Sequence, residues 1–144
     1  MGTPVVAAKF KLGQGNGAHF VDWDTDDIRY FIMTNAYAFN QAHEFVSDLT
    51  NHVTGTGAPG SSGASLTGKT VSLSGTTVQF FHDDVVIAQN AGGFSNGRVV
   101  AWAKWSGSAA TSPLIMVMTE AADFGNVGGP LTLDADAVNG VLNW

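Results

Sequence analysis

Short apolar runs separated by Gly- and Ser-rich turns dominate the hydrophobic pattern of this chain. The runs alternate apolar and polar residues or are rich in β-branched and aromatic side chains, which is typical of strands. They cover residues 4–12, 28–35, 64–73, 77–81, 85–88, 98–105, 114–119 and 130–134. This spacing predicts an all-β fold, a single-domain antiparallel β-sandwich or barrel with long Gly/Ser-rich loops.

Two β-hairpins are expected within this pattern. In the first, residues 71–80 fold back at a short polar turn centred on Ser74-Gly75, so that Val71 and Leu73 share one face. The second joins residues 98–105 to residues 113–119. Both faces of this second pair are largely apolar, which favours a central position in the sheet.

Helix is expected in at most one short stretch, around residues 40–49. Apolar residues from Ala42 to Leu49 recur there at helical spacing, and Asn40 is a plausible N-cap. The run is too short to be stable alone, so a turn-rich loop with one helical turn is the alternative.

Residues 1–12 are expected to form an N-terminal arm or first strand, and residues 13–144 the β-domain, within a single domain overall. As an extended segment, residues 4–12 present a stripe of alternate apolar side chains beside clustered positive charges. The stripe is Val6, Ala8, Phe10 and Leu12, and the charges are Lys9 and Lys11. Such an arm adds a strand to a neighbouring protein, or it is simply the first strand of the domain's own sheet.

Composition narrows the possible partners. The chain has 144 residues, no cysteine and a formal net charge of −6, with six basic residues spread thinly along it. Nucleic acid is therefore not expected as a partner, because phosphate binding needs clustered Lys and Arg. A membrane is not expected as a partner either, since no apolar run approaches the roughly 20 residues of a spanning helix. No signal peptide is visible in the sequence.

The surface is expected to associate readily. Only 12% of the residues are charged, and a sparsely charged surface resists association poorly. This composition fits a protein covered by copies of itself or by a partner, and it fits equally well a stable, weakly charged domain.

No constellation of residues predicts catalysis, a cofactor or a metal. Alternate aspartates in residues 22–27 have the spacing of an EF-hand loop, but Asp27 and Met33 stand where glycine and glutamate are needed. A solvated turn is the expected structure. His82-Asp83-Asp84 has metal-binding side chains but more simply ends a strand. With no nucleophile elbow and no cysteine, the chain is not expected to be an enzyme.

The tryptophans suggest one binding alternative. Exposed Trp23 or Trp105 would provide a stacking platform for sugars, as in a carbohydrate-binding adhesin module. Trp102 and Trp105 lie on opposite faces of a strand, so at least one of them is expected in the core or at an interface.

A fixed order of motifs runs through most of the chain. A strand at residues 28–35 leads into TNAYAFNQAHEFVSDLTNHVTGTG, and a Gly-rich turn is followed by LTGKTV, DDV, an aromatic strand and TSPLI. This order resembles small virion structural proteins of tailed bacteriophages, in particular head decoration (capsid cement) proteins.

The resemblance implies a non-enzymatic protein, made in the bacterial host cytoplasm, that binds the outer surface of the major capsid lattice in the virion and stabilises it. It also implies a homo-oligomer, for which we expect a trimer. A tail or head–tail junction protein is the alternative. The residues expected to contact the capsid or another copy are Val6, Lys9, Phe10, Lys11, Leu12, Trp23 and Trp105.

Overall fold

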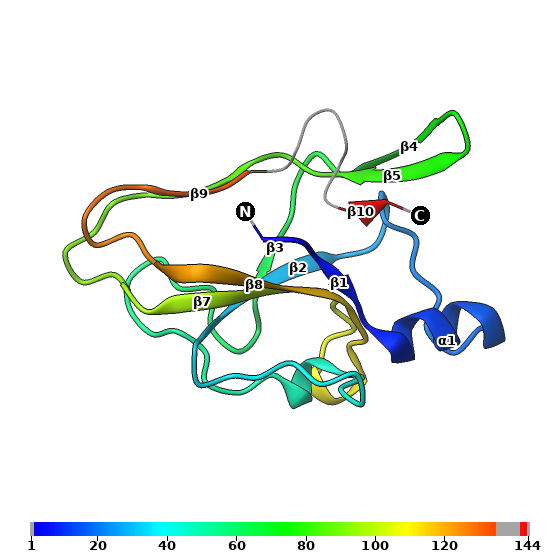
Figure 1. Cartoon of the computed structure of the whole chain (residues 1–144), viewed down its shortest axis with the longest axis horizontal. Helices are drawn as coiled ribbons and strands as arrows, with labels where there is room; N and C mark the ends of the chain where they lie inside the picture. The colour runs from blue at the N-terminus through cyan, green and yellow to red at the C-terminus, as the bar shows by residue number, and fades with distance from the viewer. Residues whose placement is uncertain (1, 135–141, 144) are drawn as a thin grey trace.

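A five-stranded antiparallel sheet forms the centre of the molecule in the computed structural model, which describes residues 2–134 and 142–143 (Figure 1). Its strand order is β1-β8-β7-β2-β3. The strands are β1 (Val5–Val6), β2 (Ile28–Thr34), β3 (Ala64–Ser65), β7 (Gly97–Lys104) and β8 (Leu114–Phe124). The hairpin expected from residues 98–119 is confirmed as β7–β8, and it lies at the centre of this sheet.

The core lies on both faces of the three central strands. The first half of β8, residues 114–118, is buried at every position, and β2 and β7 are buried over most of their length. In Figure 1, β4, β5 and β9 lie on one side of the central sheet and the loop carrying a 3₁₀ turn, η1 (Val46–Asp48), lies on the other. Because other segments pack on both faces of the central strands, these strands carry apolar side chains on both faces.

Two smaller sheets complete the fold. One has the order β10-β5-β4, and the other pairs β6 with β9. These strands are β4 (Thr70–Ser74), β5 (Thr77–Phe81), β6 (Val85–Ile87), β9 (Leu131–Leu133) and β10 (Leu142–Asn143). The all-β, sandwich-like fold is thus confirmed, and in the part of the chain described here no sheet closes into a barrel.

The hairpin expected at residues 71–80 is confirmed as β4–β5, with its turn one residue later than expected. Ser74 pairs with Thr77, so Gly75 and Thr76 form the loop. Gly75 has a φ of 61°, and glycine at the first central position is the signature of a type II′ turn. Figure 1 shows this hairpin projecting from one end of the molecule.

The structure of the N-terminal segment differs most from the structure that the sequence predicts. Val5–Val6 does form the first strand of the chain's own sheet, but the strand expected to continue to residue 12 is wrong, because α1 (Ala8–Asn16) replaces it. Gly17, with a φ of 76°, ends the helix in the left-handed conformation that glycine adopts easily. Residues two apart on a helix point in nearly opposite directions. The expected stripe is therefore divided, with Phe10 buried and Leu12 exposed.

The helix expected around residues 40–49 is also wrong, and the alternative of a loop with one helical turn is confirmed. Within this segment only η1 is helical. The Asp48 carboxylate accepts the backbone N–H groups of Glu44 and Phe45 at 2.8 and 3.0 Å. These bonds hold a compact turn, and Asn40 likewise caps a local turn by accepting the N–H of Ala42.

The run at residues 64–73 is divided between β3 and β4. Gly68 has a φ of 60°, and an added Cβ there would clash with the Asp83 carboxylate. The backbone N–H of Asp83 also donates to Thr67 O at 2.9 Å. The break therefore directs the chain from the central sheet into the projecting hairpin.

Candidate interaction surface

Large apolar side chains reach the outer surface at several places. They are Val5, Leu12, Phe20, Val71, Leu73, Val86 and Val127. The three most exposed are Phe20 (70%), Leu73 (69%) and Val86 (64%). Single exposed apolar residues are normal, whereas apolar residues grouped with other contact-forming side chains mark interaction sites. Two such regions stand out, namely α1 with the loop that follows it, and the β4–β5 hairpin.

We define the α1 surface as Lys11, Leu12 and Phe20; Lys9 is not included, because residues two apart on a helix point in nearly opposite directions. Lys11 and Leu12 are exposed on the helix, Lys9 is half-buried, and Phe20 lies beyond the helix end. The chain as a whole carries a net charge of −6, so an exposed lysine next to an exposed leucine makes this region chemically distinct from an acidic surface.

Contacts beneath the α1 surface fix its position. His19 Nε2 lies 2.8 Å from Glu44 Oε1, and the His19 ring packs edge-on against Phe45, with 5.4 Å between the ring centroids. Lys104 Nζ donates to Phe20 O at 3.0 Å. Phe20 is thus presented from an anchored backbone, which reduces the entropy lost when a partner binds.

Five of the seven residues expected from the sequence to make contacts lie in or next to α1. Lys11 and Leu12 are exposed, and Lys9 is half-buried. Val6 is half-buried in β1, opposite Met116 of β8. Phe10 is buried in the core and does not reach the outer surface. Their contacts with a partner stay a prediction.

The two tryptophans among the seven are occupied inside the protein. Trp23 is 2% exposed, and its Nε1 donates to Phe81 O at 2.8 Å. Its ring packs edge-on against Phe80 at 5.5 Å. Trp105 is half-buried, with the Arg29 guanidinium 4.7 Å from the centre of its ring. The expectation of an exposed Trp23 stacking platform is therefore wrong, because burial stabilises the aromatic face within the protein.

The aspartate cluster at residues 22–27 forms the expected turn. Asp26 Oδ2 accepts the backbone N–H of Asp22 at 2.8 Å and pairs with Lys104 Nζ at 2.8 Å. Asp27 pairs with Arg29 at 2.8 Å. Burial tends to raise the pKa of Asp27, but hydrogen bonds from Arg29 and Ser65 outweigh it and lower the pKa. Within residues 2–134 and 142–143, no three His, Cys, Asp or Glu side chains are grouped to hold a metal ion.

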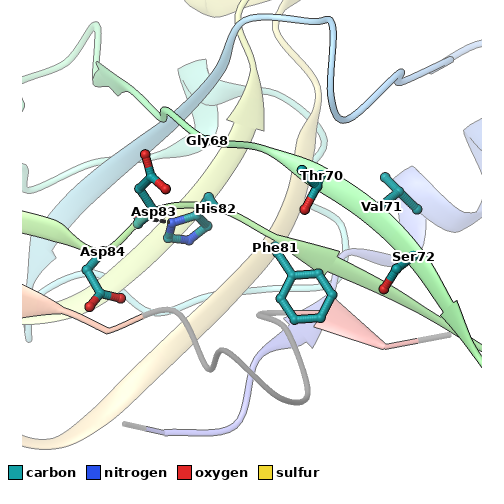
Figure 2. Close-up of a pocket in the computed structure, with 8 residues that line it drawn as sticks. All are labelled: Gly68, Thr70, Val71, Ser72, Phe81, His82, Asp83 and Asp84. Atoms are coloured by element: carbon teal, nitrogen blue, oxygen red, sulfur yellow. Dashed lines mark hydrogen bonds between the residues drawn. The ribbon is translucent and has the colours of Figure 1, made fainter.

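A groove of about 540 Å³ lies at the base of the projecting hairpin (Figure 2). It is lined by Gly68, Thr70, Val71, Ser72, Phe81, His82, Asp83 and Asp84. Figure 2 shows the carboxylates of Asp83 and Asp84 pointing to opposite sides of the chain. The Asp83 carboxylate accepts the Thr67 hydroxyl at 3.1 Å. The His-Asp-Asp sequence therefore ends a strand, and its side chains do not converge on one point.

His82 is buried beneath this groove. Its Nδ1 donates to Asp83 O at 2.6 Å, while Nε2 has no hydrogen-bond partner among the described residues. Burial lowers the pKa of His82, which keeps the ring neutral near pH 7. A neutral, enclosed histidine serves the packing of the hairpin against the core.

Sequence reasoning missed Phe20 and the outer edge of β4. Phe20 follows a run of Gly, Asn and polar residues without alternation, so no periodic signal marks it. The exposure of Val71 and Leu73 depends on which strand lies at the sheet edge, and local alternation does not give strand order.

Comparison of the chain with models of known protein families, with characterised proteins and with solved structures found no match. Across the described residues, no helix is long and apolar enough to span a membrane.

Proposed function

We propose that this chain is a non-enzymatic virion protein of a tailed bacteriophage that binds the outer surface of the major capsid lattice and stabilises it. The order of motifs along the chain supports this role. The structural observation that carries the proposal is the α1 surface, where Leu12 (60% exposed) and Lys11 are exposed on the helix and Phe20 (70% exposed) follows on an anchored backbone.

The α1 surface fits a repeated, shallow contact. Two exposed apolar side chains supply contact area, and Lys11 helps to orient an otherwise acidic molecule toward an acidic partner surface. Each contact of this size is weak, but copies linked to one another on a lattice bind by multivalency. The homo-oligomer expected from the sequence serves this purpose, and its trimeric state stays a prediction.

Binding to capsids that lack the chain tests the proposal. We expect the purified chain to bind such capsids in near-stoichiometric ratio to the shell protein. We also expect Leu12→Ser and Phe20→Ser to weaken binding at least tenfold, because each removes apolar contact area.

Val86→Ser is the matched control, since Val86 is similarly exposed but lies on β6. Equal loss of binding in the control, or only a few copies of the native chain on each particle, would contradict the proposal.

A tail or head–tail junction location stays the alternative. It predicts that labelled antibody binds the tail or the neck of the particle and leaves the shell unlabelled. The adhesin alternative loses its main support with the burial of Trp23, and Trp105 lies under Arg29.

A further inference from the structure

β4 has an unprotected edge. It lies at the end of the β10-β5-β4 sheet, and all five of its residues, Thr70–Ser74, are exposed. Natural edge strands are usually shortened, bulged, or blocked by charged residues or proline. β4 has none of these features, and its pairing with β5 is regular from end to end. The other edge strands described here are shorter, with two residues each in β1, β3 and β10 and three each in β6 and β9.

The hairpin register shows which backbone groups point outward from this edge. Ser74 and Thr77 close the two-residue turn, so they form a hydrogen-bonded pair. Hydrogen-bonded and non-hydrogen-bonded pairs alternate along antiparallel strands. Leu73 and Val71 are therefore in non-hydrogen-bonded pairs with β5, and their N–H and C=O groups face the open edge.

We propose that two copies of this chain pair antiparallel through β4, with Ser72 on the twofold axis. In this register Val71 of each copy lies opposite Leu73 of the other. These are the residues whose backbone groups face outward, so the pairing makes four backbone hydrogen bonds. It also places Val71 and Leu73 of both copies on one continuous apolar face.

A second copy matches this edge better than a charged partner strand. Residues 70–81 contain no charged residue, so the twofold pairing places no like charges opposite each other, although each chain carries a net charge of −6. Lys69, the nearest charge along β4, lies opposite the uncharged Gly75 of the second copy. A twofold contact also needs a surface patch that is complementary to itself, and the Val71–Leu73 pairing has this property.

The contact is small, so we expect dimerisation to depend on concentration. Stable dimers usually bury about 1,200 Å² or more in total, and one five-residue edge supplies only part of that area. The inference is independent of the capsid proposal, because the purified chain alone tests it and its failure leaves the capsid assay unaffected.

Introduced cysteines test the register directly, because the native chain has no cysteine. Ser72 would face Ser72 of the second copy in a non-hydrogen-bonded pair, with the Cα atoms about 4.5 Å apart, within the range of a disulfide. Two copies of Ser74 would lie about 13 Å apart, too far to be bridged. We expect Ser72→Cys to form a disulfide dimer under mild oxidation, while the matched control Ser74→Cys stays largely monomeric on a denaturing gel.

Sedimentation of the native chain over a range of concentrations supplies the second measurement. We expect a monomer–dimer equilibrium that Leu73→Pro weakens at least tenfold, because proline removes an outward N–H while the bonds to β5 remain. Leu73→Thr keeps that N–H and should retain most of the dimer. Circular dichroism checks that each variant is folded.

A chain that stays monomeric at millimolar concentration would overturn the inference. A trimer without cross-linking at Ser72, or equal cross-linking of the two cysteine variants, would do the same.

Discussion

Asn126 joins three segments that are distant in sequence. Its side chain is fully buried; Oδ1 accepts the Phe94 N–H at 3.0 Å, and Nδ2 donates to Thr56 O at 3.0 Å and to Ala88 O at 2.9 Å. All three bonds go to loop backbone, so one amide replaces the secondary structure that these loops lack.

We expect Asn126→Ala to lower the free energy of unfolding by about 3 kcal/mol, since three buried hydrogen bonds at about 1 kcal/mol each are lost. Urea denaturation measures the change. Asn96→Ala is the control, because Asn96 is exposed in a neighbouring loop and its removal should change stability by less than about 0.5 kcal/mol. Equal effects of the two substitutions would contradict the role given to Asn126.

A half-buried histidine, His52, and a buried one, His82, make stability depend on pH. Burial lowers the pKa of both His52 and His82 below the ordinary value of 6.5. As the pH falls through 6.5 the unfolded chain takes up protons that the folded chain resists, so stability is full above that pH and decreases below it.

The free energy of unfolding should therefore fall between pH 7 and pH 5, and the double variant His52→Gln/His82→Gln should show a flatter dependence. The pKa is lowered for Asp22, Asp27 and Asp48, so their protonation affects stability only below their ordinary pKa of 3.8, outside this window. An unchanged pH dependence in the double variant would show that neither histidine contributes.

Long-range contacts of single residues, such as these, could not be predicted from the sequence. The aspartate turn could be predicted because its hydrogen bonds are local, as those from Asp22 to Asp26 show. The role of Asn126 depends on contacts to residues 38 and 70 positions away, and no local pattern carries that information.

At the scale of elements, α1 shows how two glycines in one helix differ. Gly13 is buried, and an added Cβ would lie 2.5 Å from a ring carbon of His19. Nothing lies within 4 Å of the position a Cβ would take at Gly15. The first glycine is required for helix docking, whereas the second only weakens the helix.

We expect Gly13→Ala to destabilise the protein by about 1–3 kcal/mol through overpacking. Gly15→Ala should stabilise it by up to about 1 kcal/mol, because alanine is the better helix former. Thermal unfolding of both variants measures the opposite signs. Destabilisation of similar size by both would mean that α1 does not dock through His19.

Strands were easier to predict than helices in this chain. The alternation in residues 77–81 gave β5 with its observed bounds, and the Gly75 turn set the register of its hairpin. In residues 4–12 the alternation was misleading, because Lys9, Phe10 and Lys11 occupy a helix whose buried side is narrow. Lys11 and Leu12 are exposed on this helix and not on the expected strand, and their contacts with a partner stay a prediction.

Across the whole molecule, local stability against opening should be highest at the centre and decrease toward the exposed strands. β2, β7 and the first half of β8 are buried on both faces, whereas β4 is exposed throughout. Amide hydrogen exchange should be slowest in β7, near the rate of global unfolding, and fast at Val71 and Leu73 in dilute solution.

At high concentration, protection should rise at these two positions if β4 pairs as proposed. Nuclear magnetic resonance resolves individual amides. Uniform protection across β4 and β7 would contradict the graded picture.

The arrangement of strands was the part of the fold that the sequence left open. β1 pairs with β8, and β2 with β7, across more than 60 residues of chain. Such pairings depend on how the apolar faces fit together once the whole chain is assembled, and the alternation of side chains is the same for many strand orders.

The self-matched edge of β4 also limits growth. A strand that meets its own copy about a twofold axis has used its outward hydrogen-bonding groups, so a third molecule cannot extend the sheet through β4. An exposed strand edge that could otherwise seed a fibril is therefore closed after a single pairing step.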